Sequence, residues 1–164
     1  MKKLVLLLGV FALIGCGEKN ESGASAAEAT GDTPKSLSDA DVERLLKEAV
    51  DIESLEERDG LAHQPNESEP FSGWAKTIHD SGQVQGLGQF KDGKQHGLLT
   101  VWAHNGQKVK EGIWKDGKPD GPYTEWHENG QKATEVTFKD GEEVSTKHWD
   151  SKGEDVETAD EAIE

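Results

Sequence analysis

The chain has 164 residues, of which 31% are charged and only 32% hydrophobic, so it cannot build a thick two-layer core along its whole length. We therefore expect one small domain with segments outside it. The formal net charge of −15 argues against a nucleic-acid partner, because phosphate binding needs a basic face. Most of the acidic excess lies in the flanks, since residues 71–149 hold 11 acids and 10 bases.

The N-terminus has the pattern of an export signal. Two lysines precede an uncharged, mostly apolar run at 4–14, which is too short to span a bilayer comfortably. The run ends in LIGC, which resembles the bacterial lipobox, where the peptide is cut before the cysteine and the cysteine is acylated. This resemblance implies a signal peptide at 1–15 and a fatty acyl group (palmitate or a similar chain) on Cys16. An ordinary secretory signal with a chance cysteine is the alternative.

Lipid on Cys16 would hold the chain on a membrane of the bacterial cell envelope, since each buried methylene contributes roughly 0.8 kcal/mol. The mature chain is too acidic to bind anionic lipid by charge. Gly17 is not the acidic residue that retains some lipoproteins at the inner membrane, so we expect the outer membrane if the organism has one.

Residues 16–37 are rich in Gly, Ser, Ala, Glu and Thr and predict a flexible linker from the lipid anchor. Residues 38–57 predict an amphipathic helix that starts at Ser38 and ends before Asp59-Gly60. Apolar residues fall on one face of this helix at 42, 45, 46, 49 and 52. That face needs a partner surface, either the protein's own sheet or a second protein.

A repeat of 24 residues fills the middle of the chain. Its units are 73–96, 97–120 and 121–144, followed by a partial unit at 145–154. A fixed period of this kind indicates a repeat architecture. Six glycines recur in two columns that mark turns, namely Gly82, Gly106 and Gly130 in one and Gly93, Gly117 and Gly141 in the other.

Both glycine columns predict hairpin turns, because Asn-Gly and Asp-Gly supply the positive φ angles of tight turns. The fold class predicted is mainly β, a single-layer antiparallel meander of hairpins at 58–149 preceded by one amphipathic helix. Residues 150–164 predict an acidic, disordered tail.

Two-residue loops would pair Leu98 with Ile113 and Trp102 with Val109, while Leu99 would lie across from Gly112 on the other face. Both faces are then partly apolar, and the helix or sheet curvature covers part of one. We expect the uncovered aromatic side chains to form a binding surface. The alternative is that they only stiffen the sheet by packing over glycines. The candidate contact residues are Trp102, Trp114, Tyr123 and Trp126.

The pattern G-x-x-x-x-W-x-x-N-G-Q-K followed by K-D-G-K-x-x-G resembles the variant MORN repeat found in YwqK-type antitoxin proteins. The lead-in at 56–73 also resembles the segment that these proteins place before their first repeat, and the match covers roughly 58–149. The resemblance implies antiparallel hairpins in an elongated, twisted sheet. It also implies a surface that binds or scaffolds proteins or, in some cases, lipids.

No catalytic or metal-binding pattern is found in the sequence. None of the six histidines has the spacing of a zinc site, and Cys16 is the single cysteine. No serine lies in a Gly-x-Ser-x-Gly motif, and no helix follows the glycine turns to hold a phosphate. We therefore expect no enzyme activity, metal, cofactor or small-molecule substrate.

The sequence as a whole predicts a membrane-tethered, non-catalytic binding or scaffold module of the envelope with a protein partner. Two alternatives remain. One is an antitoxin-like protein that neutralises a toxin, although the export signal fits poorly with a cytoplasmic toxin. The other is a structural spacer whose tryptophans all belong to the core.

Overall fold

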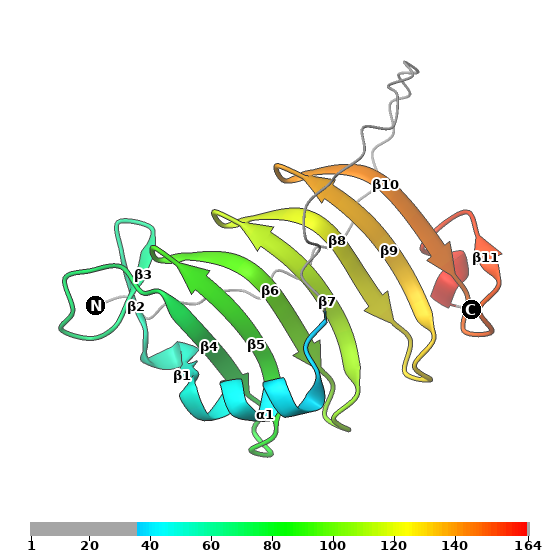
Figure 1. The fold of residues 1–164 in the computed structure, drawn as a ribbon. Coiled ribbons are helices and arrows are strands. Elements are labelled where there is room, and N and C mark those ends of the chain that lie inside the picture. Colours follow the sequence, from blue (N-terminus) through cyan, green and yellow to red (C-terminus); the bar gives the residue numbers. More distant parts are fainter. Residues whose placement is uncertain (1–35, 164) are drawn as a thin grey trace.

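The computed structural model describes residues 36–163, so the predicted signal peptide, Cys16 and most of the linker lie outside the described residues. The predicted fold class is confirmed: a nine-stranded sheet runs along the chain, with helix α1 (Asp39–Glu48) before it (Figure 1). The strands are β1 (Val50–Asp51), β2 (Glu56–Arg58), β3 (Leu61–His63), β4 (Gly73–Ile78), β5 (Val84–Lys91), β6 (Lys94–Trp102), β7 (Lys108–Lys115), β8 (Lys118–Trp126), β9 (Lys132–Lys139), β10 (Glu142–Trp149) and β11 (Asp155–Val156).

Strands β4 to β11 follow one another in space in the order of the sequence, and all their pairings are antiparallel. Two features depart from a pure meander. Strand β1 pairs with β4 in parallel, and β2 and β3 form a separate two-stranded sheet. No helix within 36–163 is long and apolar enough to cross a membrane.

Helix α1 is shorter than the predicted 38–57, because it ends at Glu48. Its start agrees with the sequence, since the Ser38 side chain accepts a hydrogen bond from the backbone N–H of Asp41. Beyond the helix, Val50 pairs with Ala75 at the sheet edge, and a short 3-10 helix follows at Ile52–Ser54. Tertiary pairing and core packing thus outweigh the apolar periodicity that continues past residue 48.

Helix α1 packs on the protein's own sheet, as the first of the two alternatives predicted. Its Leu45 and Ala49 are buried against Leu87, which is 1% exposed. Trp74 and Trp102 pack around this cluster. In Figure 1 the helix lies across the strands at the N-terminal end of the large sheet.

The turns that contain Asp-Gly are two-residue hairpins in which both residues have positive φ, such as 50° at Asp92 and 77° at Gly93. Asp59-Gly60 has the same geometry and joins β2 to β3, so the prediction that it ends the helix is wrong. The chain therefore makes its first hairpin before the first repeat unit begins.

The turns that contain Asn-Gly are three-residue loops rather than the predicted two-residue loops. In the first, the Ala103 N–H donates to Gln107 O and only Gly106 has positive φ. The extra residue produces a bulge, so Trp102 pairs with Lys108 and not with Val109. Beyond the bulge the predicted register is confirmed, because Leu98 pairs with Ile113 and Leu99 with Gly112.

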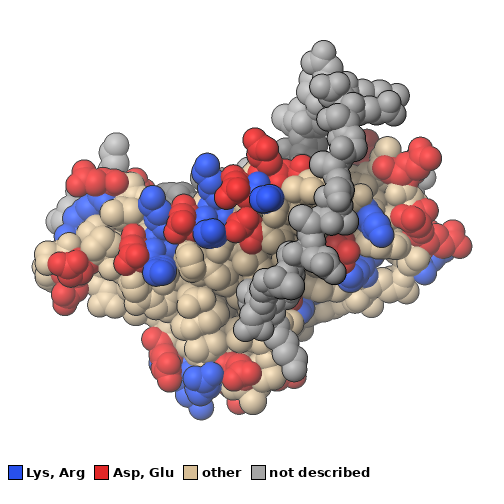
Figure 2. All heavy atoms as spheres, turned by 45° about the horizontal axis from the view of Figure 1, so that its top comes forward, with Lys and Arg blue, Asp and Glu red and all other residues tan. Residues whose placement is uncertain are grey.

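Successive Asp-Gly turns are joined by backbone hydrogen bonds, which we call the turn ladder. The glycine N–H of each turn donates to a carbonyl 22 residues earlier, with partners Gly93 to Phe71 (2.8 Å), Gly117 to Gln95 (2.8 Å) and Gly141 to Pro119 (2.9 Å). The aspartate N–H donates to a side chain 20 residues earlier, with partners Asp92 to Ser72, Asp116 to His96 and Asp140 to Asp120. Figure 2 shows acidic and basic groups alternating along the side of the sheet where the strands end in these turns.

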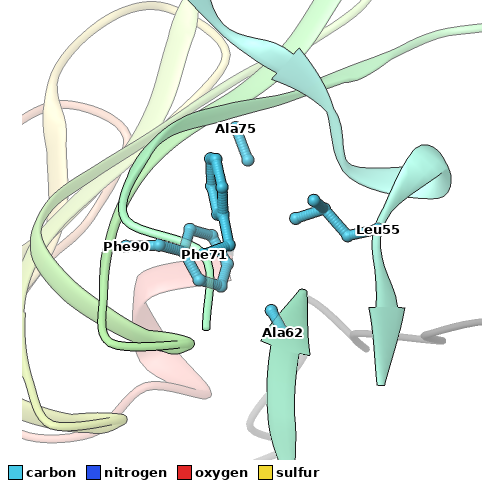
Figure 3. Close-up of a cluster of buried hydrophobic side chains, with 5 residues drawn as sticks. All are labelled: Leu55, Ala62, Phe71, Ala75 and Phe90. Carbon is cyan, nitrogen blue, oxygen red and sulfur yellow. The ribbon is translucent and has the colours of Figure 1, made fainter. Parts of the chain in front are cut away.

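The small β2–β3 sheet covers the other side of the large sheet at its N-terminal end. Leu55 and Ala62, each 2% exposed, pack there on Phe71, Ala75 and Phe90 (Figure 3). The rings of Phe71 and Phe90 lie 5.9 Å apart. The first unit is therefore covered on both sides, by α1 on one and by β2–β3 on the other.

The predicted disorder of residues 150–164 is wrong for the part that the structure describes. Another three-residue loop forms between Asp150 and Glu154, where the Asp150 N–H donates to Glu154 O. Strand β11 then pairs with the end of β10. A second 3-10 helix lies at Glu161–Ile163, with Ala162 5% exposed. This loop has the same two backbone hydrogen bonds as the earlier ones, and they order the segment despite its low apolar content.

Candidate interaction surface

The strand registers define two faces of the sheet, because paired residues on neighbouring strands project to the same side. Leu87, Thr100 and Glu111 lie in one continuous row on the side that carries α1, which we call the helix face. Gly88, Leu99, Gly112, Tyr123 and Val136 form the neighbouring row on the other side, which we call the aromatic face.

The four predicted contact residues do not lie together. The structure brings Trp114 and Tyr123 into contact on the aromatic face. Trp102 lies in the cluster beneath α1, on the opposite face. Trp126 is also on the helix face, where the Lys108 ammonium lies 4.7 Å from its ring centre. Each of these four side chains is half-buried.

Three rings on the aromatic face form a continuous series, which we call the aromatic row: Trp114, Tyr123 and Phe138. The Trp114 and Tyr123 ring centres are 6.1 Å apart and inclined at 74°, and those of Tyr123 and Phe138 are 6.1 Å apart at 77°. Edge-to-face contacts of this kind stabilise aromatic pairs by about 0.5–1.5 kcal/mol each.

Gly112 makes room for the aromatic row. A Cβ atom at this position would lie 2.6 Å from Cδ2 of Tyr123 and 2.7 Å from Cζ3 of Trp114. The absence of a side chain on β7 therefore allows two rings from neighbouring strands to lie over the backbone. The sequence analysis named the packing of tryptophans over glycines as the alternative to a binding surface, and it did not identify Phe138 as a member of the row. Its shared repeat column with Trp114 was the available signal.

The central ring of the aromatic row is hydrogen-bonded to an ion pair. The Tyr123 hydroxyl donates a 2.5 Å hydrogen bond to Oε1 of Glu125, and Nζ of Lys110 lies 2.6 Å from the same oxygen. Burial raises the pKa of the Tyr123 phenol well above its usual range, and the Glu125 carboxylate raises it further. The phenol is therefore a fixed hydrogen-bond donor rather than a nucleophile.

The first repeat unit has a buried ring at the position that Trp114 and Phe138 occupy in the later units. Phe90, Trp114 and Phe138 occupy equivalent positions 24 residues apart. Phe90 is 5% exposed because Phe71 and the β2–β3 sheet pack against it. Trp114 and Phe138 are half-buried, and their recorded ring contacts are with Tyr123. The cover that the β2–β3 sheet gives to this column thus stops after the first unit.

The helix face beyond α1 has a different character. Lys108 contacts both the Trp126 ring and Glu111, whose carboxylate is 3.0 Å away. One unit later, Lys132 repeats the arrangement with Trp149 and Glu135. Ammonium groups thus lie over these tryptophan rings, and the surface between them is polar. The aromatic face is the better candidate for an apolar contact.

Three of the histidines, His79, His104 and His127, have structural partners. Nε2 of His79 lies 3.0 Å from the Trp102 carbonyl oxygen, and Nε2 of His127 lies 2.8 Å from that of Trp149. The His79 ring also stacks on His104 at 3.8 Å between centres. Between residues 36 and 163 there is no group of three or more His, Cys, Asp or Glu side chains that could hold a metal ion.

Comparison with curated proteins and with solved structures found no match. Comparison with protein families found one: the model of the MORN repeat variant family matches residues 119–140. This segment contains nearly all of β8, the Asn-Gly turn and β9, including Tyr123 and Phe138 of the aromatic row. The match supports a MORN-type repeat in this chain, in the part of the sheet that the chain's own helix and hairpin leave uncovered.

Proposed function

We propose that this protein is a non-catalytic binding module, tethered to a membrane of the bacterial cell envelope, whose aromatic row contacts a protein partner. One observation carries the proposal. Trp114 and Phe138 lack the cover that β2–β3 gives to the equivalent Phe90. A partner that packs on these rings as Leu55 and Ala62 pack on Phe90 would extend the same contact to the later units.

Two further features support a protein partner. MORN repeats are generally involved in protein–protein or protein–membrane interactions, and the matched segment carries two of the three rings. The row is also bounded by the Lys110–Glu125 pair, which offers both charges at its rim. An apolar centre with a polar rim is the usual anatomy of a protein interface.

Photo-crosslinking tests the contact without removing a ring. A benzophenone-bearing phenylalanine analogue at Phe138 is expected to crosslink a specific envelope protein in living cells. The matched control is the same analogue at Thr137, which is exposed on the opposite face of the same strand. Identical products from both positions, or none from Phe138, would overturn the proposal. A small toxic protein as the product would instead favour the antitoxin-like alternative.

The membrane tether has its own test. The lipobox-like sequence that ends at Cys16 supports acylation of that thiol, and the cell envelope is the compartment that this signal implies. Metabolic labelling with a fatty-acid analogue is expected to label the native chain and not the Cys16→Ser variant. Label in both chains, or in neither, would remove the tether from the proposal. Fractionation of the labelled protein would then distinguish the outer from the inner membrane.

A further inference from the structure

The last long strand of the sheet is paired along only part of its outer side. Strand β11 pairs with His148 and Trp149 of β10 and ends at Val156. Within the described residues, no strand pairs with the outer side of β10 from Glu142 to Lys147. We call this stretch the open edge. Its backbone N–H and C=O groups are available to another strand.

The repeat shows which element the open edge lacks. Strand β8 has the same place in its unit as β10, and β9 pairs with β8 all the way from Trp126 to Gly121. Strand β11 starts as β9 does, directly after a turn, but pairs for two residues only. The chain then leaves the sheet for the 3-10 helix that buries Ala162. The site for the rest of that strand is therefore unfilled by residues 36–163.

Val144 distinguishes the open edge from the inner strands. It occupies the column of Ser72, His96 and Asp120, whose side chains accept the backbone N–H of the next turn in the ladder. Valine cannot accept this hydrogen bond, so the turn ladder cannot continue past β10 in the same form. Instead, Val144 is 64% exposed and is the bulged residue between Glu143 and Ser145. The edge thus presents an apolar side chain where the earlier strands present an acceptor.

The surroundings of the open edge are acidic. Eight acidic residues and two lysines lie between residues 142 and 163: Glu142, Glu143, Asp150, Glu154, Asp155, Glu157, Asp160 and Glu161 against Lys147 and Lys152. Figure 2 shows acidic groups gathered at this C-terminal end of the sheet. Two copies that paired through their open edges would bring two such acidic ends together, which disfavours a dimer.

We propose that the open edge binds a basic, extended polypeptide segment, which adds to β10 as an antiparallel strand and places an aliphatic side chain against Val144. Backbone hydrogen bonds provide affinity in this mode, and alternate side chains provide specificity. The lysines or arginines of the segment would face the acidic residues of the C-terminal end. The open edge adjoins the aromatic row, since Glu143 pairs with Phe138, but the proposal does not depend on the function proposed for the row.

The probe for this site can be designed from the chain itself. An eight-residue peptide with the β9 sequence, in which lysine replaces the glutamate (KATKVTFK), keeps the side-chain alternation that pairs with β8 and is basic. The first control peptide has proline in place of valine (KATKPTFK), which removes one backbone donor. The second has glutamate in place of each lysine (EATEVTFE) and keeps the apolar pattern.

The basic peptide is expected to bind the full chain in detergent solution and to slow amide exchange in Glu142–Lys147. Val144→Lys should weaken binding roughly tenfold or more, because it removes the apolar contact and adds a like charge. Val144 is mostly exposed, so this variant should keep the melting temperature of the native protein. A Trp114→Phe variant, altered in the aromatic row on β7, which β8 and β9 separate from β10, should bind the peptide as the native chain does.

Three results would overturn the proposal. The first is equal binding of the acidic and basic peptides, or binding of neither. The second is peptide binding that Val144→Lys leaves unchanged, with exchange slowed elsewhere than in β10. The third is a stable dimer of the native chain that Val144→Lys dissociates, since the occupant of the open edge would then be a second copy.

Discussion

Tyr123 and Glu125, two residues apart on β8, are joined by a 2.5 Å hydrogen bond from the phenol to the carboxylate. Lys110 on β7 holds the same carboxylate oxygen from the other side. The central ring of the aromatic row is thus held by a hydrogen bond to a carboxylate that also forms an ion pair, and all three side chains are half-buried. Because the phenol must stay protonated to donate, the row depends on the protonation state of its central ring.

Tyr123 is the single tyrosine of the chain, so tyrosinate absorbance reports this residue alone. In the folded protein the absorbance should rise only well above pH 10, the usual pKa being about 10. Because the folded-state pKa is raised, the stabilising contribution of Tyr123 is present below about pH 10 and is lost as the pH rises further. The urea-unfolded protein is the control. A native midpoint near the unfolded value would contradict this account.

Glu125→Gln separates burial from the effects of the Glu125 carboxylate on the pKa of Tyr123. Burial is the larger cause and remains in the variant, whereas the effect of the neighbouring negative charge is lost. The pKa of Tyr123 should therefore fall from its native value but stay above that of the unfolded chain. If the variant titrated like the unfolded protein, the carboxylate and not burial would be the main cause.

Gly112→Ala should destabilise the fold more than Gly88→Ala does. At Gly112 a Cβ would lie 2.6 Å from Tyr123 and 2.7 Å from Trp114, both ring atoms of a packed row. At Gly88, in the same row of the sheet, the nearest atom is a Leu99 methyl at 3.2 Å. We expect Gly112→Ala to cost about 1–3 kcal/mol of unfolding free energy, as overpacking usually does. Urea denaturation of both variants measures the difference, and equal losses would contradict it.

Leu45→Ala should detach helix α1 from the sheet. Leu45 is 6% exposed and packs with Leu87, so the substitution should cost about 2–5 kcal/mol of unfolding free energy. Tryptophan emission should also shift to longer wavelength, because Trp74 and Trp102 pack against the same cluster. Glu43→Ala, on the exposed side of the helix, should change neither quantity. Unchanged emission from Leu45→Ala would show that α1 does not shield these rings in solution.

Asp120→Ala tests the turn ladder. The Asp120 carboxylate accepts a 3.1 Å hydrogen bond from the backbone N–H of Asp140, and its loss should cost about 0.5–1.5 kcal/mol. Amide exchange at Asp140 should accelerate in the variant. Asp80→Ala, in an exposed loop at the opposite end of the strands, is the matched control. Unchanged exchange at Asp140 would mean that the side chain contributes nothing to the ladder.

Much of the fold could be predicted because the repeat over-determines it. Glycines in two columns set the positions of the turns, and the turns set the pairing of Leu98 with Ile113 and of Leu99 with Gly112. Where one extra residue enters a loop, as at Asn105-Gly106, the pairing near the turn shifts by one. Composition and period do not report the length of a loop, so this shift escaped prediction.

The segments outside the repeat were harder to predict. The apolar stripe of α1 continues to Ile52, and only the pairing of Val50 with Ala75 explains why the helix stops earlier. The site was predictable in part. Trp114 and Tyr123 were identified as candidates, but the sequence could not show that α1 would cover Trp102 and not these two.

The turn ladder also has a consequence for length. Each 24-residue unit is bonded to the previous one at an equivalent turn, and the strands contact mainly their immediate neighbours. A unit adds two strands, or about 10 Å, without changing the packing at either end. Insertion or deletion of a whole unit would thus change the distance from the N-terminal helix to the last strand in equal steps.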